Sequence, residues 1–185
     1  MTVPSAFVTA LAARPVLHTS RLCLRTPVEA DIPAIIAIAG DWEVARRLAR
    51  MPHPYTAEHA RYFLDVVVPA ELVWAIVERA SGDVVGVVGL SAGGDHLELG
   101  YYIAQPHWGR GLATEAGAVV VAYGAGLVGQ GALRSGYFAD NPASGRVLAK
   151  LGFIAVAQAE RPCLTTGETK RSVEVAMVPG RNTST

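Results

Sequence analysis

Hydrophobic and polar residues alternate along several short stretches of the chain, as expected for strands with one buried face. In the stretch 18–25, for example, Leu22 and Leu24 alternate with polar or small residues. Other stretches are rich in β-branched and aromatic residues, and turn-forming residues such as Gly82-Asp83 separate them. Strands are therefore predicted at 18–25, 72–79, 84–90, 98–103, 133–139, 153–159 and 172–178.

Between these strands, apolar residues recur at helical spacing, for example Ile32, Ile35, Ile36 and Ala39. Helices are predicted at 26–40, 42–50, 57–68, 112–123 and 140–151. The resulting order, β-α-α-α-β-β-β-α-β-α-β-β, predicts one α/β (α+β) domain in which helices flank a mixed sheet.

Composition narrows the class of protein. Sixteen basic residues balance sixteen acidic ones, so bulk charge favours neither a nucleic-acid partner nor a membrane surface. The two cysteines lack metal-ligand spacing, and no metal is expected. No basic stretch precedes the apolar N-terminal residues, so a cytoplasmic protein is expected. The domain should span 16–179, between an N-terminal extension (1–15) and a flexible tail (180–185).

The most informative stretch is 98–126, which indicates a strand, a glycine-bearing loop and a long apolar helix. Gly109 and Gly111 allow a sharp turn and close approach of a ligand to the backbone. The free N–H groups at the start of the helix, together with Arg110, predict an anion site. A nucleotide P-loop is disfavoured because its Gly-Lys-Ser/Thr is absent, and a dinucleotide loop because Thr114 replaces its third glycine.

The segment Trp108-Gly-Arg-Gly-Leu-Ala-Thr-Glu-Ala116 resembles the pyrophosphate loop of the GNAT superfamily of acyl-CoA-dependent N-acyltransferases, in its RimJ/RimL-type branch. Segments 19–25 and 141–153 are similar to other signatures of this branch. The resemblance covers nearly the whole chain. It implies the GNAT fold, a mostly antiparallel sheet of about seven strands, and acetyl-CoA as co-substrate without a metal.

The resemblance also implies where coenzyme A binds. The strand before the loop would hold the pantetheine arm through the backbone of Tyr102 and Ile103. Asn141, at the start of the 140–151 helix, would bond the pantetheine amides or simply cap that helix. The diphosphate would lie on the loop residues, which are Gly109, Arg110, Gly111, Leu112, Ala113 and Thr114.

Acyl transfer to an amine requires removal of a proton, stabilisation of an oxyanion and protonation of the leaving thiolate. Glu98 is a candidate base, directly or through water, although a salt-bridged surface role fits its position equally well. Leu148 stands where many family members have a tyrosine acid. Ser144 resembles the residue used in the RimJ/RimL branch, with helix capping or cofactor contact as the alternative. A backbone N–H near Ile103 would stabilise the oxyanion.

The acceptor is the least constrained part of the reaction. Aromatic residues that are candidates for lining its cleft are Trp42, His53, Tyr55, Tyr101 and Tyr137. The sequence predicts direct acetyl transfer, in a ternary complex, to a primary amine that is either a protein N-terminus or a small molecule. A homodimer is one possible assembly. The alternative function is a non-catalytic acyl-CoA-binding module that acts as a sensor or partner subunit.

Overall fold

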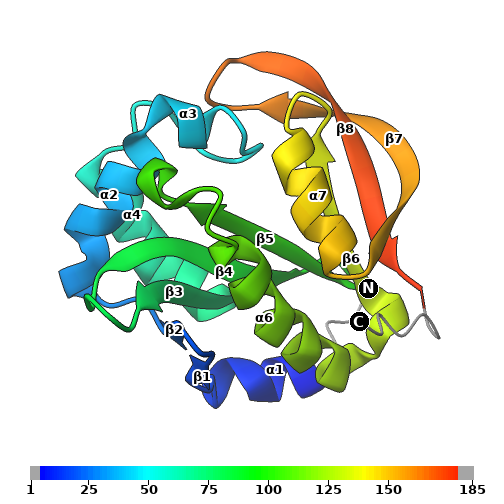
Figure 1. Cartoon of the computed structure of the whole chain (residues 1–185), viewed down its shortest axis with the longest axis horizontal. Helices are drawn as coiled ribbons and strands as arrows, with labels where there is room; N and C mark the ends of the chain where they lie inside the picture. The colour runs from blue at the N-terminus through cyan, green and yellow to red at the C-terminus, as the bar shows by residue number, and fades with distance from the viewer. Residues whose placement is uncertain (1–4, 179–185) are drawn as a thin grey trace.

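The computed structural model describes residues 5–178, so the predicted 180–185 tail lies outside the described residues. It confirms the α/β class, with a mostly antiparallel sheet in the order β1-β2-β3-β4-β5-β6-β8-β7 (Figure 1). The strands are β1 (Leu17–His18), β2 (Leu22–Arg25), β3 (Leu72–Glu78), β4 (Val84–Ala92), β5 (Leu97–Ile103), β6 (Leu133–Phe138), β7 (Phe153–Cys163) and β8 (Glu168–Met177). The α-helices are α1 (Ser5–Ala12), α2 (Ile32–Gly40), α3 (Trp42–Ala45), α4 (Ala57–Tyr62), α5 (Val68–Ala70), α6 (Leu112–Val128) and α7 (Pro142–Lys150).

The single strand predicted at 18–25 is wrong, because the chain turns back on itself there. The N–H of Thr19 donates to the carbonyl of Leu22 (3.0 Å), and the N–H of Leu22 donates to the Thr19 hydroxyl (2.9 Å). These bonds close a turn that pairs His18 with Cys23 and splits the stretch into β1 and β2. The split accounts for an eighth strand in the sheet.

The helix predicted at 42–50 is also too long, since α3 ends at Ala45. From Ala45 onward, backbone carbonyls also accept hydrogen bonds from a distant turn. The hydroxyl of Thr165 donates to the carbonyls of Ala45 (3.0 Å) and Met51 (2.8 Å), and the N–H of Leu164 donates to Ala49 (3.0 Å). This turn joins β7 and β8, which are both longer than predicted. Its hydrogen bonds fix the 47–52 loop beside the sheet.

The helix α6 is longer than predicted, continuing past Gly124 to Val128. A Cβ at Gly124 would lie 2.8 Å from a methyl carbon of Leu90. This glycine therefore serves close packing of the helix on the sheet rather than helix termination. The segment predicted as an N-terminal extension contains α1, whose Phe7 is buried in the core.

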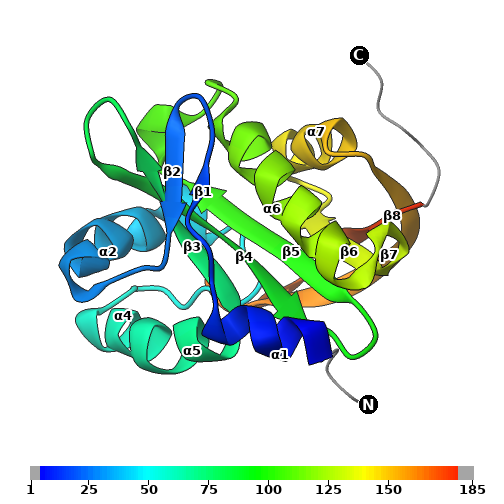
Figure 2. The same cartoon turned by 90° about the horizontal axis from the view of Figure 1, so that it is seen from below.

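Helices cover both faces of the sheet. Figures 1 and 2 show α2 and α4 on one side and α1 and α6 on the other. The larger core lies between α6 and the sheet and contains the fully buried Trp74, whose indole N–H donates to the carbonyl of Pro15 (2.8 Å). A smaller cluster of Val68, Val73 and Val87 lies on the opposite face. Within residues 5–178, none of the helices combines the length and apolarity needed to cross a bilayer.

The sheet opens at its centre. The parallel strands β5 and β6 pair only at Leu97 with Leu133 and at Glu98 with Arg134. Beyond these pairs β5 follows β4 and β6 follows β8, so the two central strands diverge (Figure 1). The divergence leaves one edge of β5 unpaired in the middle of the sheet, beside the beginnings of α6 and α7.

Candidate active site

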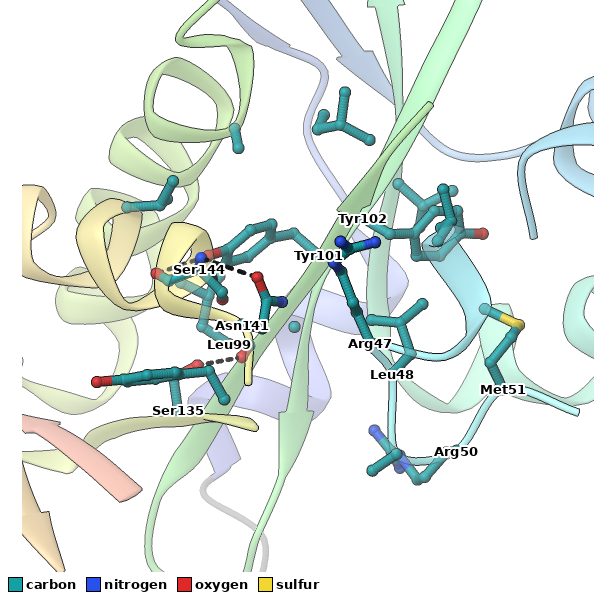
Figure 3. Close-up of a pocket in the computed structure, with 18 of the residues that line it drawn as sticks. Arg47, Leu48, Arg50, Met51, Leu99, Tyr101, Tyr102, Ser135, Asn141 and Ser144 are labelled. Carbon is teal, nitrogen blue, oxygen red and sulfur yellow. Dashed lines mark hydrogen bonds between the residues drawn. The ribbon is translucent and has the colours of Figure 1, made fainter. Parts of the chain in front are cut away.

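A cavity of about 1360 Å³ lies at this opening. It is lined by β5 and β6, the 47–52 loop, the glycine loop before α6 and the first turn of α7. Figure 3 shows side chains from these elements converging on β5, with Tyr101 and Tyr102 pointing to opposite sides of the strand. The site therefore has two halves, one toward α6 and α7 and one toward the 47–52 loop and α4.

The glycine loop has the conformation that its sequence predicts. Gly109 and Gly111 have φ angles of +74° and +75°, in the region that glycine adopts without strain. A Cβ at Gly109 would meet nothing within 4 Å. Gly111 is the N-cap of α6 and supplies no side-chain cap, so the first N–H groups of the helix lie open toward the cavity. This arrangement favours an anion.

A set of hydrogen bonds holds the loop from behind. The carboxylate of Glu115 accepts from the hydroxyls of Thr19 (2.5 Å) and Ser20 (3.2 Å) and from the N–H (3.0 Å) and Nε (2.7 Å) of Arg21. The guanidinium of Arg21 also donates to the carbonyl of Arg110 (2.9 Å). Burial alone would raise the pKa of Glu115, but these hydrogen bonds lower it below its ordinary value. The β1–β2 turn thus clamps the start of α6.

The side chain of Arg110 points away from the cavity, although its charge was expected to assist the anion site. Its guanidinium bonds Oε1 of Glu78 and lies 2.8 Å from Nδ1 of His107. Arg110 is absent from the cavity lining, whereas Gly109, Gly111, Leu112, Ala113 and Thr114 are all part of it. Any anion recognition by this loop therefore rests on backbone groups and the helix terminus.

The open edge of β5 presents Tyr101 and Ile103 rather than Tyr102. The N–H of Ala104 donates to the carbonyl of Val85 on β4 (2.9 Å). Because backbone groups alternate between the two edges of a strand, Tyr102 also faces β4, and Tyr101 and Ile103 face the opening. The carbonyl of Ile103 accepts from the indole N–H of Trp108 (2.7 Å). The free groups on this edge are thus the N–H and C=O of Tyr101 and the N–H of Ile103.

At the start of α7, Asn141 acts as the helix cap, its side-chain oxygen accepting from the N–H of Ser144 (3.3 Å). The hydroxyls of Ser144 and Tyr101 lie 2.8 Å apart, and the Ser144 carbonyl, 3.3 Å from the phenol oxygen, is a second acceptor within its reach (Figure 3). Burial raises the pKa of Tyr101 to about 12, although the hydrogen bond with Ser144 opposes the shift. The predicted acid Ser144 therefore has a phenol as its neighbour.

Tyr101 was predicted on the acceptor side, and its pairing with Ser144 is a feature that the sequence reasoning missed. Strand alternation contains the signal, because Tyr101 is three residues from Glu98 and so lies on the opposite face of β5. Leu148 is 1% exposed in the core and offers no proton. The phenol in this half of the site comes from β5 instead of α7.

Glu98 lies on the other face of β5 and lines the cavity. Its carboxylate accepts from the guanidinium of Arg161 on β7 (3.0 Å), which also pairs with Glu174 on β8. The structure confirms the salt bridge expected for Glu98 and places the residue in the cavity lining, while its role as a base stays a prediction. Arg161 is a second residue that the sequence reasoning did not select, since no local motif links it to Glu98.

The other predicted acceptor residues separate into two groups. Tyr55 and Tyr137 line the cavity, with Tyr137 packed beneath α7, where a Cβ at Gly145 would touch its ring. Trp42 and His53 lie outside the lining and pack against each other with ring centroids 5.2 Å apart. These two were expected in the wall, Trp42 from an early helix and His53 from the 50–56 loop. Their rings, however, pack on each other outside the lining.

Arg47 is a cavity residue that nothing in the sequence pattern indicated. Its guanidinium lies over the Trp108 ring, 4.8 Å from the centroid, and it is paired with Glu43 (2.8 Å). It thereby connects Glu43 of α3 to Trp108, at the beginning of the glycine loop. Among residues 5–178, no group of three potential metal ligands is present.

Comparison with known proteins agrees with this geometry. Residues 21–154 match the family "Acetyltransferase (GNAT) domain". The chain is 31% identical over 147 residues to YoaA of Bacillus subtilis, named as an uncharacterized N-acetyltransferase, covering 75% of this chain and 82% of that protein.

Solved structures with the same fold include a GNAT-family acetyltransferase from Bacillus anthracis, with a TM-score of 0.77, 19% identity and coverage of 89% of this chain and 98% of that one. Another is a spermidine N-acetyltransferase from Vibrio cholerae in complex with CoA and spermine, with a TM-score of 0.71, 16% identity and coverage of 85% and 95%. The family match extends over most of the domain, from the clamp at Arg21 through the glycine loop to the strand after α7. The chain therefore belongs to the GNAT acetyltransferase family.

Proposed function

We propose that this protein is an N-acetyltransferase of RimJ/RimL type that transfers the acetyl group of acetyl-CoA directly to a primary amine in a ternary complex. The observation that carries the proposal is the opening between β5 and β6. On one side of it lies the N-terminus of α6, which has no side-chain cap, and on the other lies the carboxylate of Glu98. The assignment to this branch rests on the three sequence segments 19–25, 108–116 and 141–153.

The residues of the first half fit coenzyme A. Gly109, Gly111 and the N–H groups of 112–114 would hold the diphosphate, because the loop has no Cβ in the way and the helix dipole favours negative charge. The open edge of Tyr101 and Ile103 would bond the pantetheine amides as a neighbouring strand would. Acetyl-CoA supplies an activated thioester when it is bound.

Proton removal from the amine is assigned to Glu98, directly or through one water. Its carboxylate faces the cavity from the side opposite Tyr101, so an amine can approach from the 47–52 loop while the thioester lies toward α7. Arg161 holds the carboxylate in place through a 3.0 Å bond. The N–H of Ile103 is the donor proposed for the charge that develops on the carbonyl oxygen.

Ser144 is proposed to donate a hydrogen bond to the leaving sulfur. The phenol of Tyr101 has one proton, and when it donates this proton to Ser144 Oγ (2.8 Å) rather than to the Ser144 carbonyl (3.3 Å), the serine proton can point into the cavity. The non-catalytic module is less favoured, because a hydroxyl pair and a carboxylate remain on the two sides of the opening even though Leu148 replaces the tyrosine of other members.

The proposal extends to a cytoplasmic location and to a homodimer as the assembly to test, both on the grounds of the sequence alone.

The direct experiment measures thiol release from acetyl-CoA with a panel of primary amines and N-terminal peptides, with mass spectrometry of the products. At least one acceptor should gain an acetyl group. Retention of coenzyme A with no acetylated product across the panel would favour the module.

The assignment of Glu98 is tested with Glu98→Gln, and Glu174→Gln is the matched control because it shares Arg161 but lies outside the main cavity. In the Glu98 variant, kcat should fall by about tenfold to a hundredfold. The decrease of kcat at low pH that the wild type shows should disappear. The control should retain both. An unchanged pH profile in Glu98→Gln would remove this residue from proton transfer.

A further inference from the structure

The acceptor half of the cavity has a floor made of glycine. Gly89 on β4 lies directly opposite Gly100 on β5, between the pair Val87 and Tyr102 on one side and the pair Ser91 and Glu98 on the other. Because residues two apart on a strand share a face, these three pairs point the same way. A Cβ at Gly100 would meet nothing within 4 Å, whereas one at Gly89 would lie 3.0 Å from the Leu72 carbonyl, so the hollow lies over Gly100, between Tyr102 and Glu98.

The wall at the Tyr102 end of this hollow is apolar. Tyr102 packs with Val73, Val87 and the side chains of Phe63 and Val67. Tyr55 and Met51 complete the lining on the loop side. Burial raises the pKa of Tyr55 to about 12 and also raises the pKa of Tyr102, so both phenols stay uncharged at neutral pH.

The charged side chains around the hollow are already paired with one another. In the structure of residues 5–178, Arg47 pairs with Glu43 (2.8 Å), Arg161 with Glu98 (3.0 Å) and Arg50 with Glu71 (3.7 Å).

Three arginines and two glutamates line this half, namely Arg47, Arg50, Arg161, Glu71 and Glu98. Glu43 and Glu174, outside the lining, bind Arg47 and Arg161, so each of these arginines is neutralised by a carboxylate. Both lining carboxylates of this half are likewise bound by arginines, so a second ammonium group would have to compete with Arg50 or Arg161 for its partner.

We propose that the acceptor is a primary amine carried on an uncharged, apolar body, which lies on the Gly89–Gly100 floor against Tyr102 while the amine reaches Glu98. This inference rests on the proposed acetyl transfer and narrows its substrate class. It differs from a polyamine, whose second ammonium group would have to displace an arginine from its carboxylate. Gly100 is then a residue that determines the size of acceptor admitted.

The first experiment compares hexylamine with hexamethylenediamine, which have the same chain length and differ only in the second amine. We expect kcat/KM for hexylamine to exceed that for the diamine by at least about tenfold, with phenethylamine also a substrate. Equal or better use of the diamine would overturn the inference. The proposed function would stand in that case, because acetyl transfer to an amine would have been observed.

The second experiment fills the hollow with Gly100→Val and uses Gly126→Val on α6 as the matched control, since a Cβ at Gly126 also meets nothing within 4 Å. Gly100→Val should retain its thermal stability and its affinity for coenzyme A. Its kcat/KM for phenethylamine should fall by at least about tenfold. Its kcat/KM for methylamine, which is too small to extend over the floor, should equal that of the wild type. The control should match the wild type with both amines.

Unchanged use of phenethylamine by Gly100→Val would show that the acceptor body does not lie on this floor, and the inference would be wrong. An equal loss with methylamine and phenethylamine would also overturn it, because the substitution would then act on the reaction rather than on acceptor size. If wild-type protein binds coenzyme A but acetylates none of these amines or the peptide panel, the proposed function fails, and the substrate inference fails with it.

Discussion

The two halves of the cavity are built in different ways. The half toward α6 and α7 is made of backbone groups and short local motifs, and a hydrogen-bonded clamp at Glu115 fixes it from behind. The half toward the 47–52 loop is made of side chains from β3, β4, β5 and the segments between α3 and α5. Bonds from the β7–β8 turn, at Leu164 and Thr165, hold that loop in place.

This difference separates the binding of the cofactor from the selection of the acceptor. A diphosphate and two amides can be bound by N–H and C=O groups, which every residue carries, so the first half depends on conformation more than on side chains. An acceptor body is selected by shape and charge, so the second half depends on which side chains meet. Substitutions in the two halves should therefore produce different kinds of defect.

The largest effect is expected at Gly109. In Gly109→Val, a side chain would stand where the diphosphate approaches, and the loss of about two charge-assisted hydrogen bonds predicts a fall in coenzyme A affinity on the order of a thousandfold. Gly129→Val is the matched control, because Gly129 also has a positive φ (+79°) and open space around it but lies at the far end of α6. Calorimetric titration with coenzyme A measures the affinity of both variants.

Both variants should lose free energy of unfolding, since a branched residue at positive φ is strained at either position. If Gly129→Val lost coenzyme A affinity to the same extent as Gly109→Val, the loop would have no special part in binding. The account of the first half as a backbone anion site would then be wrong.

The next effect concerns the hydroxyl pair. Ser144→Ala should lower kcat by about tenfold to a hundredfold with little change in KM for acetyl-CoA, because the hydrogen bond to the leaving sulfur matters mainly in the transition state. Tyr101→Phe should lower kcat by about tenfold. The double variant should be no slower than Ser144→Ala, since Tyr101 acts through the serine.

Tyr123→Phe is the control for removal of a hydroxyl, because Tyr123 lies on α6 and packs against Trp74 away from the cavity. Single-turnover measurements with thioesters of more acidic thiols add a stricter test. The defect in Ser144→Ala should shrink as the leaving thiol becomes more acidic. A defect that is the same for every thioester would assign Ser144 and Tyr101 to structure alone.

A smaller effect is expected for the clamp. The pKa of Glu115 is lowered in the folded protein, so its contribution to stability is full above the unfolded-state pKa of about 4.3 and is lost as the pH falls through the folded-state value. Glu115→Gln should therefore reduce the free energy of unfolding by about 2 kcal/mol at neutral pH, measured by urea denaturation. The difference from the wild type should diminish as the pH falls toward about 3.

Glu160→Gln, an exposed position on β7, should show no such difference at either pH. A Glu115→Gln variant as stable as the wild type at neutral pH would mean that the β1–β2 turn does not depend on this carboxylate. The rigidity attributed to the first half would then need another source.

The smallest effect is expected at Trp42, which is 47% exposed and packs on His53 outside the cavity. Trp42→Ala should change kcat/KM for the amine acceptor by less than about twofold, as is usual for a substitution remote from the site. Tyr55→Ala, within the lining, should lower it by about tenfold. A large defect in Trp42→Ala would extend the acceptor half outward to α3.

Much of the fold could be predicted because its signals are local. Alternation and turn residues placed β3, β4 and the start of α6 within two residues of their observed positions. The predictions at 18–25 and 42–50 failed because the hydrogen bonds of Thr19 and Thr165 end those elements. Thr165 in particular is more than a hundred residues from the carbonyls that it bonds.

The sequence by itself determined the glycine loop, the capped start of α7 and the family, because each depends on residues adjacent in the chain. Only the tertiary structure decided that Arg110 turns toward Glu78, that Tyr101 meets Ser144 and that Arg161 holds Glu98. It alone placed Gly89 opposite Gly100, the pair that we propose as the floor for the acceptor. The physical reason is that a backbone site is specified by local dihedral angles, whereas a side-chain site is specified by strand register and packing between segments far apart in the sequence.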